Sequence, residues 1–443
     1  MIKKIAASII LNYLRILSSI QLKKNKNATV IGVTGSAGKT STRLAIAHIL
    51  KSRGVVKQSV HANSESGIPL NILGLRPLNY SALDWARLVI LAPLMLLFNW
   101  EKYNYYIVEM GIDSPDEPKN MSYLLKIITP HIGVVLNAGL THAATFDHLV
   151  KDRDALRRAT KLRRLIAAEK MRLVHGIGRA GVSVINVDQP DMVAHRKGIR
   201  SRQITFGKSS RANLRITQSL ISRTGYIMRF SYQGTTYALS LPDIYTEGYA
   251  STFAAAIAAA AAVGVSPSSS VQALSSYRAP AGRLHIFAGI KETTIIDSSY
   301  NASPDTMHEA LKLLSKLAGR ARRLAVLGDM RELGSSTKLA HKNLADWVLK
   351  YCDEVILFGE ATGTYTLPVL ESKKFPVRHF TKMSELIGYL QKTAKPKEWI
   401  LIKGSQNTIL LERAVESLLE HKSQISLLCR RGSYWDELRA TTL

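Results

Sequence analysis

The chain has 443 residues, of which 46% are hydrophobic, so it is long and apolar enough for two or three globular domains, and a disordered protein is excluded. Lysine and arginine outnumber aspartate and glutamate by 60 to 33, and the net charge of +27 suits a nucleotide, a nucleic acid or an acidic membrane surface, or reflects only a solvated basic surface. Two cysteines, Cys352 and Cys429, exclude a disulfide framework and a four-cysteine zinc site, so we expect a cytoplasmic protein.

The first element along the chain is an apolar run at residues 5–20, with lysines on both sides. It contains Asn12 and Arg15, and it is shorter than the roughly 20 apolar residues that a membrane-spanning helix needs. It also lacks the small-residue cleavage site of a signal peptide. Residues 1–27 are therefore expected to form a basic, amphipathic N-terminal segment.

A phosphate-binding loop follows at residues 32–41, GVTGSAGKTS. Residues 28–33 are typical of a short buried strand, and residues 40–51 carry apolar side chains at helical spacing. Such a loop needs glycines whose backbone N–H groups converge on phosphate, a lysine for the outer phosphates and a hydroxyl for magnesium. Val33 stands where the usual loop has its first glycine, so the pattern is G-x-x-G-K-T. The required groups occur in order as Gly35, Gly38, Lys39 and Thr40.

A second apolar run, residues 88–98, belongs to an apolar insertion at about 76–104. Pro93 interrupts this run, and Trp85 and Trp100 flank it. Tryptophans at both ends suit a helix at a membrane interface, whereas a helix buried against the domain is the alternative. The sequence leaves both interpretations open.

Strands and helices alternate along most of the chain. A basic helix is predicted at 149–175, a β-rich piece at 203–241 and an alanine-rich helix at 251–263. The alternation restarts after about residue 280, which predicts an α/β fold with mostly parallel sheets: a central P-loop ATPase domain at 28–280 and a Rossmann-like C-terminal domain at 281–443. The other strands are predicted at 105–110, 132–136, 182–187, 294–297, 324–327, 355–358 and 399–402.

Polar side chains stand where two of these strands end. Glu109 ends the strand at 105–110, where an open α/β sheet places its ligand groups, and Mg²⁺ bound to a triphosphate takes one or two carboxylates. Asn137 and His142 follow the next strand. We therefore expect these groups to gather around the phosphate loop.

Taken together, the motifs resemble those of the Mur ligases, over about residues 28–430. The type that joins D-alanyl-D-alanine to UDP-N-acetylmuramoyl-tripeptide is the most similar. The resemblance implies that ATP phosphorylates the terminal carboxylate of the peptide and that the incoming amine displaces phosphate from the acyl phosphate. UDP-muramoyl-peptide and D-alanyl-D-alanine would then be the small-molecule substrates, in peptidoglycan synthesis. The motifs are GVTGSAGKTS, NSESGIPLNILGL (63–75), VEMGID (108–113), LNAGLTHAATF (136–146), IAAEK (166–170), AGRLHIF (281–287), DSSYNASPDTM (297–307), LGDMRELG (327–334) and LIKGSQNT (401–408).

The resemblance also implies roles for single residues. Lys39 would stabilise the transferring phosphoryl group, Thr40 and Glu109 would hold one Mg²⁺, and His142 would bind a second. Lys170 aligns with a lysine that carbon dioxide carbamylates in several Mur ligases, which would make it an anion that supports magnesium. The expected catalytic residues are thus Lys39, Glu109, His142 and Lys170. The expected ATP contacts are Gly35, Ser36, Ala37, Gly38, Lys39, Thr40, Ser41, Arg283, Asp297, Tyr300 and Asn301.

Two of the chain's departures from the family affect the expected ligand contacts. Ser298 stands where a second acidic residue is common, so the ribose contact expected there is in doubt and Asp297 is its alternative source. Fewer than thirty residues precede the ATPase strand, where a full-length ligase of this type carries a domain that grips UDP. Residues 1–27 and the insertion at 76–104 are expected to provide a substitute surface or to dock the enzyme on the cytoplasmic membrane.

Four alternatives remain, and the first is another Mur-type amino-acid ligase. A folylpolyglutamate synthase-like ligase usually has G-K-G-S in its loop, whereas this chain has G-K-T-S. A basic P-loop ATPase acting on nucleic acid is remote, because no recognisable DNA- or RNA-binding module is present, and we expect no nucleic-acid partner. A non-catalytic scaffold docked on a membrane would not need the lysine, the hydroxyl and the carboxylate together.

Overall fold

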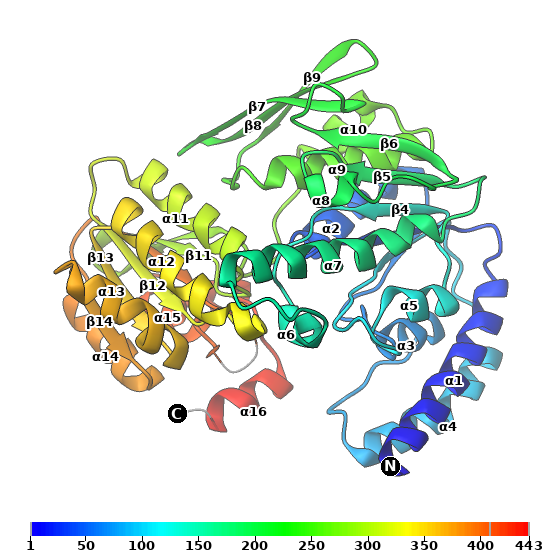
Figure 1. Ribbon diagram of the computed structural model, residues 1–443, viewed down its shortest axis with the longest axis horizontal. Coiled ribbons are helices and arrows are strands. Elements are labelled where there is room, and N and C mark those ends of the chain that lie inside the picture. The colour runs from blue at the N-terminus through cyan, green and yellow to red at the C-terminus, as the bar shows by residue number, and fades with distance from the viewer. Residues whose placement is uncertain (1, 407–408, 442–443) are drawn as a thin grey trace.

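The computed structural model describes residues 2–406 and 409–441, in two halves that each surround one β-sheet (Figure 1). The first sheet has the strand order β2-β3-β1-β4-β5-β6-β7-β8-β9. It is parallel from β2 to β7, and β7, β8 and β9 form an antiparallel meander at its edge. Its strands are β1 (Thr29–Thr34), β2 (Val56–Gln58), β3 (Tyr105–Glu109), β4 (Ile132–Val135), β5 (Val182–Asn186), β6 (Arg202–Gly207), β7 (Leu214–Ser222), β8 (Gly225–Tyr232) and β9 (Thr235–Leu241).

Helices cover both faces of the parallel part of this sheet, which is why its central strands are apolar throughout. Apolar side chains of α2 (Lys39–Leu50) and α9 (Tyr249–Ala262) form the core on one face. Those of α5 (Met121–Ile127) and α7 (Ala155–His175) form it on the other. Gly32 allows this packing, because a Cβ atom there would lie 2.6 Å from Pro130 Cγ. This glycine therefore serves the core of the sheet.

The second sheet has the order β10-β11-β15-β12-β13-β14, and only the pair β10–β11 is antiparallel. Helices α11 (Pro304–Ala318) and α12 (Thr337–Tyr351) pack on one face, and α14 (Met383–Thr393) and α15 (Glu412–Leu418) pack on the other. The predicted fold of mostly parallel, doubly covered sheets is confirmed in both halves. The strands are β10 (His285–Gly289), β11 (Thr293–Asp297), β12 (Arg323–Gly328), β13 (Glu354–Phe358), β14 (Val377–Phe380) and β15 (Trp399–Lys403).

The basic helix predicted at 149–175 begins later than expected, at Ala155. The reason is the Asp154 side chain, which accepts a hydrogen bond from Arg157 N and so caps the helix. Residues 147–149 form a separate short 3₁₀ turn. The remaining helices are α3 (Gly67–Leu73), α6 (Ala143–Phe146), α8 (Pro190–Val193), α10 (Pro267–Leu274), α13 (Leu367–Ser372) and α16 (Ser433–Thr441).

Two apolar helices, α1 (Ile2–Lys23) and α4 (Ala82–Phe98), extend from the first half on the side away from the second (Figure 1). The expectation that the first apolar run is too short is wrong, since residues 5–23 of α1 are long and apolar enough to cross a membrane by length and composition. The expected interruption at Pro93 is also wrong, since α4 continues through it. Proline leaves the carbonyl four residues earlier without its helical partner, and here Tyr13 OH donates to that carbonyl, Val89 O, at 3.2 Å.

Hydrogen bonds join the two halves at two separate places. Arg223, in the turn between β7 and β8, donates to Leu317 O at 2.8 Å and Ala318 O at 2.9 Å, the last carbonyls of α11. A cation at a helix C-terminus also interacts favourably with the helix dipole. At the second place, Ser335 N donates to Asp147 Oδ2 at 2.7 Å. These contacts connect the second half to the β7–β8 turn and to the 3₁₀ turn at residues 147–149.

Candidate functional site

The phosphate loop connects the buried strand β1 to α2, and Gly38 has the left-handed backbone conformation there, with φ of 84°. Within the described residues, no side chain caps the start of α2. The Asn137 amide braces the loop from the end of β4, since Oδ1 accepts from Ala37 N at 2.9 Å and Nδ2 donates to Ala37 O at 3.1 Å. Uncapped N–H groups at a helix start are suited to phosphate, so the loop fits a nucleotide.

Lys39, Ser36 and Ser41 take different positions in this loop. Lys39 Nζ donates to Gly35 O at 2.7 Å, across the space in front of the helix. Burial lowers the pKa of Lys39, and although the nearby Glu109 carboxylate opposes this shift, the charge of Arg283 adds to it. Ser36 Oγ accepts from Gly139 N at 2.8 Å and so fixes the loop. Ser41 instead lies beneath the loop, where its hydroxyl contacts Tyr249 OH at 3.2 Å.

Glu109 lies next to the loop, at the end of β3, as the sequence predicts. Its Oε2 accepts from Thr40 Oγ1 at 3.2 Å, and its Oε1 accepts from Arg43 Nε at 2.7 Å. Arg43 also donates to Gln58. In the part of the chain that the structure describes, no cluster of three or more His, Cys, Asp or Glu side chains could hold a metal ion. The adjacent Thr40 hydroxyl and Glu109 carboxylate are groups that could hold a Mg²⁺ ion together with phosphate and water.

His142 connects the two halves. Its Nδ1 lies 2.8 Å from Glu332 Oε2, and its Nε2 lies 3.6 Å from Asp113 Oδ1. The hydrogen bond to His142 lowers the pKa of Glu332. Among the described residues, His142 makes no hydrogen bond or ion pair with Thr40 or Glu109. A role for His142 at a second Mg²⁺ stays a prediction.

Lys170 is buried on α7, with 1% of its surface exposed. No described residue accepts a hydrogen bond from its Nζ. Burial lowers the pKa of Lys170 well below its ordinary value, and the charge of nearby Lys39 lowers it further. A solvated lysine on a basic helix would be exposed, and its pKa would not be lowered by burial.

Arg283 brings the second half to the phosphate loop. Its Nη2 lies 3.5 Å from Thr40 Oγ1, and its guanidinium lies 4.4 Å from the centre of the Tyr300 ring. A guanidinium over an aromatic face is held by the ring's negative quadrupole, so Tyr300 positions Arg283. The predicted approach of Arg283 to the ATP-binding loop therefore has a structural basis in this contact.

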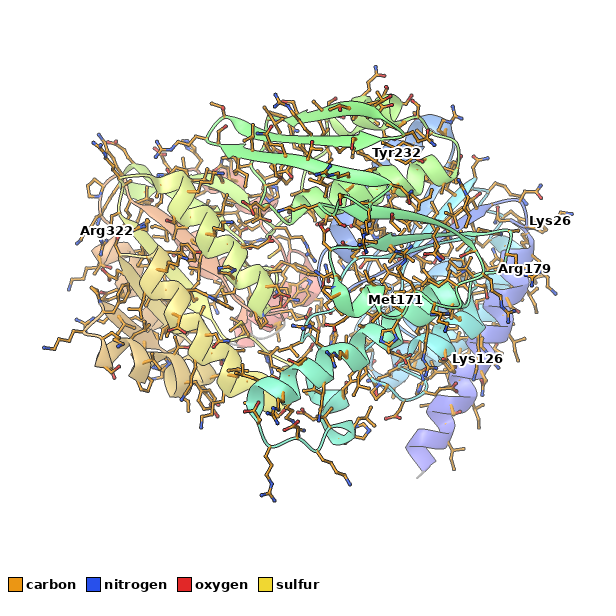
Figure 2. The ribbon with its side chains drawn as sticks, turned by 45° about the horizontal axis from the view of Figure 1, so that its top comes forward. Lys26, Lys126, Met171, Arg179, Tyr232 and Arg322 are labelled. Carbon is orange, nitrogen blue, oxygen red and sulfur yellow. The ribbon has the colours of Figure 1, made fainter. Side chains whose placement is uncertain are left out.

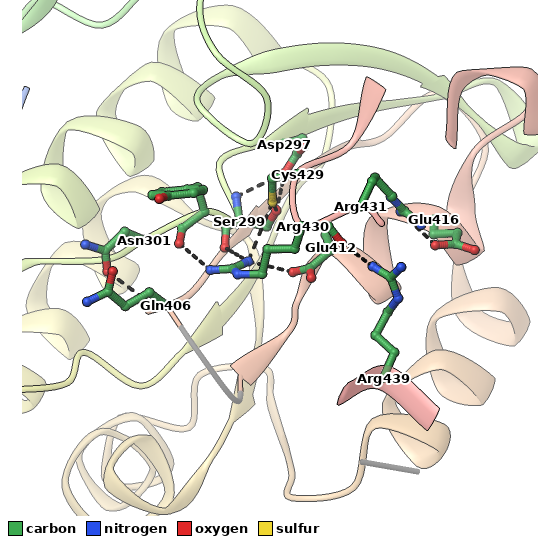
Figure 3. A network of polar contacts seen from close by, with 11 residues as sticks. Asp297, Ser299, Asn301, Gln406, Glu412, Glu416, Cys429, Arg430, Arg431 and Arg439 are labelled. Atoms are coloured by element: carbon green, nitrogen blue, oxygen red, sulfur yellow. Dashed lines mark hydrogen bonds and ion pairs between the residues drawn. The ribbon is translucent and has the colours of Figure 1, made fainter. Parts of the chain in front are cut away.

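The segment after β11 is held by a buried network around Arg430 (Figure 3). Arg430 pairs with Glu412 at 2.8 Å and donates to Ser299 O at 3.3 Å and to Tyr300 O. Asp297 is fully buried, and its Oδ1 accepts from Ser299 Oγ at 2.6 Å, while its Oδ2 has no partner among the described residues. The ribose contact of Asp297 stays a prediction.

Sequence reasoning missed Lys403, at the end of β15. Its Nζ donates to Asn301 O at 2.8 Å and to Ser298 Oγ at 3.1 Å. The pKa of Lys403 is lowered to about 7, first by burial and second by the positive charge of nearby Arg283. Its place at the carboxyl end of a parallel strand was the available signal. Three lysines thus lie around the site with lowered pKa values, the half-buried Lys39 and the buried Lys170 and Lys403. An anionic ligand would compensate their positive charges.

We expect Lys403 to make the ligand-free protein more stable as the pH rises from 7. Between its folded pKa of about 7 and its ordinary value of 10.5, only the unfolded state keeps this proton. The free energy of unfolding therefore rises with pH by up to about 1.4 kcal/mol per pH unit. Thermal unfolding of the wild type and Lys403→Met from pH 7 to 9.5 checks this. A stability difference between them that stays constant with pH would contradict it.

Arg430→Met is expected to destabilise the protein by about 3–5 kcal/mol, because it leaves the Glu412 carboxylate buried without its partner. Arg431→Met is the matched control. Its ion pair with Glu416 is partly exposed, so the loss should be about 1 kcal/mol or less. Chemical denaturation measures both, and equal losses would show that the Arg430 network is not the stronger one.

The comparisons with known proteins agree with this arrangement. A family described as "Mur ligase middle domain" matches residues 33–260, and "Mur ligase, glutamate ligase domain" matches residues 282–406. A ligase of Bacillus subtilis named UDP-N-acetylmuramoyl-tripeptide--D-alanyl-D-alanine ligase is 26% identical over 394 residues, 88% of this chain and 76% of the relative. The enzyme of that name from Escherichia coli is 24% identical and covers 89% of this chain and 77% of its own.

Solved structures show the same fold. MurF ligase from Thermotoga maritima, in complex with ADP, has a TM-score of 0.73 at 22% identity and covers 97% of this chain and 84% of its own. A folylpolyglutamate synthase, in a structure described as an FPGS-AMPPCP complex, has a TM-score of 0.60 at 18% identity and covers 92% of this chain and 95% of its own.

Proposed function

The chain belongs to the Mur ligase family of ATP-dependent, ADP-forming ligases, and we propose that it joins D-alanyl-D-alanine to UDP-N-acetylmuramoyl-tripeptide in peptidoglycan synthesis. One observation carries the ligase chemistry: a phosphate loop with the Thr40–Glu109 pair beside it, faced by Arg283 from the second half. The relatives that share most of the chain's length carry this activity in their names, which supports the choice of substrates.

In this proposal ATP lies between the two halves, with its phosphates on the loop at residues 35–40. A carboxylate oxygen of the peptide attacks the γ-phosphorus and ADP leaves. The amine of D-alanyl-D-alanine then attacks the acyl carbon, and phosphate leaves with that oxygen. Mg²⁺ on Thr40 and Glu109 would neutralise phosphate charge. Lys39 would turn from Gly35 O to the transferring phosphoryl group, and Arg283 would hold the phosphates from the other side.

We also propose that Lys170 is carbamylated. Its lowered pKa favours the neutral amine, whose nitrogen can form a bond to the carbon of CO₂ and release a proton. The product is an anion at a position where an ammonium group is opposed both by burial and by Lys39. His142, which already contacts two carboxylates, would support a second Mg²⁺.

We place the reaction in the cytoplasm, next to the membrane, where α1 and α4 would make a peripheral contact. The matched relatives act on UDP-linked precursors according to their names, and the buried cysteines fit a reducing compartment. Enzyme and lipid surface would then be close together.

The proposal is tested by ADP release from the purified protein with ATP and Mg²⁺. We expect release to require UDP-N-acetylmuramoyl-tripeptide and D-alanyl-D-alanine together. Single amino acids should not replace the dipeptide. Release that instead requires a folate and glutamate would overturn the choice of substrate, and release stimulated by nucleic acid without any amine would overturn the ligase assignment.

Glu109→Gln is expected to raise the Mg²⁺ concentration for half-maximal activity by about tenfold or more, because the amide keeps the shape and loses the charge. The amide oxygen of the new side chain can still accept from Arg43, so the fold should persist. Asp116→Asn, at an exposed carboxylate, is the control. A magnesium titration of ADP release compares the three proteins, and an unchanged curve for Glu109→Gln would make Glu109 a structural residue only.

A further inference from the structure

Helices α1 and α4 run in the same direction and pack together along one side. Tyr13 near the middle of α1 contacts Val89 of α4, and Gln21 near its end donates to Asn99 O at 2.8 Å. A small apolar cluster fastens the pair to α3. Its buried members are Leu14, Leu70, Leu73, Leu75, Leu88 and Ala92.

The opposite side of the pair is apolar and exposed. On α1 the exposed residues recur at helical spacing, and the same holds on α4, so each helix has one apolar stripe. Because the helices are parallel and the seam residues Tyr13 and Val89 fix their rotation, both stripes point to the same side of the pair. We call these residues the α1–α4 face, and each of them is at least 42% exposed: Ile5, Ile9, Ile16, Ile20, Leu83, Ile90, Leu94, Leu97 and Phe98.

Lysines surround Trp100 where this face meets the body of the protein. Lys24 Nζ lies 4.2 Å from the centre of the Trp100 ring, and Lys102 Nζ lies 5.9 Å from it. With Lys23 and Lys26 they line a cavity of about 400 Å³ that no carboxylate lines. Figure 2 shows Lys26 at this end of α1. Glu101, which follows Trp100 in the sequence, is paired with Lys57.

An exposed apolar face of this size marks an interaction surface. The residues at its edge indicate which kind of partner binds there. A tryptophan and several lysines at the edge of an apolar face match the headgroup region of an anionic bilayer. We propose that the α1–α4 face docks in the plane of a membrane containing anionic phospholipids, with Lys23, Lys24, Lys26 and Lys102 at the headgroups. α1 does not cross the bilayer, because Leu14, Ser18 and Gln21 on its other side are buried against the protein.

Co-sedimentation with vesicles tests this. We expect the wild type to bind vesicles of phosphatidylcholine with phosphatidylglycerol. The double variant Ile9→Asp and Phe98→Asp should bind at least about a hundredfold more weakly. Two apolar side chains that would enter the bilayer are replaced by charged ones. The matched control, Leu156→Asp with Leu220→Asp, changes exposed apolar residues outside the face and should bind like the wild type.

Lys23→Gln with Lys26→Gln should weaken binding to the anionic vesicles about tenfold or more and leave binding to pure phosphatidylcholine unchanged. ADP release with soluble substrates should be normal in every variant, so loss of docking is distinguished from loss of the ligase function. The proposal is overturned if the wild type stays in the supernatant or if the aspartate and control variants bind equally. A lipid-free dimer of the wild type that the aspartates dissociate would also overturn it, because a second copy would then cover the face.

Discussion

Lys39→Ala is expected to lower ADP release by about 10²- to 10³-fold or more and to leave the fold intact. The loss follows from the place of Nζ, which lies across the loop from Gly35 O, where charge on a transferring phosphoryl group would develop. Stability should hold or increase, because burial already opposes the charge of Lys39 and lowers its pKa. Steady-state kinetics and thermal unfolding measure the two effects.

The matched control is Lys51→Ala, which removes an exposed lysine just after the same helix and should leave both rate and stability nearly unchanged. An Lys39→Ala enzyme with normal turnover would remove the loop lysine from the mechanism. A variant that fails to fold would contradict the inference that this charge opposes folding.

Lys170→Ala is expected to remove most activity, and formate or acetate should partly restore it by occupying the vacated anionic position. The reason is that a carbamate on Lys170 would be an anion beside Lys39. Lys161→Ala, which removes a largely exposed lysine from the same helix, should keep full activity and change stability by no more than about 0.5 kcal/mol. Kinetics with and without the short carboxylates measure the rescue.

A second readout does not depend on turnover. Wild-type protein in ¹³C-labelled bicarbonate should show a carbamate carbon signal by NMR, and Lys170→Ala should lack it. A fully active Lys170→Ala enzyme in bicarbonate-depleted buffer, or the same signal in both proteins, would show that Lys170 is not the carbamylated group.

The sequence predicted the fold and the loop because both depend on local patterns. Alternating apolar strands and amphipathic helices encode doubly covered parallel sheets, and the glycines, Lys39 and Thr40 follow one another directly. Glu109 was predictable from its place at a strand end. The pairing of Glu109 with Arg43 was not predictable. The residues around an arginine on a helix do not indicate that it will pair with a carboxylate on a strand elsewhere in the chain.

The second half shows the same limit. Nothing near Arg430 in the sequence indicates that it holds the backbone of Ser299 and Tyr300, which are about 130 positions away. The rule that proline interrupts a helix failed at Pro93 for a similar reason. The hydrogen-bond donor to Val89 O is Tyr13, which is on a helix far away in the sequence. The burial of α4 was equally undetermined, because its apolar composition fits a core and a lipid surface alike.

The central claim is that this chain activates a peptide carboxylate with ATP and passes it to an amine, and an isotope transfer tests it most directly. UDP-N-acetylmuramoyl-tripeptide labelled with ¹⁸O in its terminal carboxylate is incubated with ATP, D-alanyl-D-alanine and the protein, and the released phosphate is analysed by mass spectrometry. We predict one ¹⁸O atom in the phosphate for each amide formed and none in the nucleotide. Unlabelled phosphate, or label in AMP, would contradict the account.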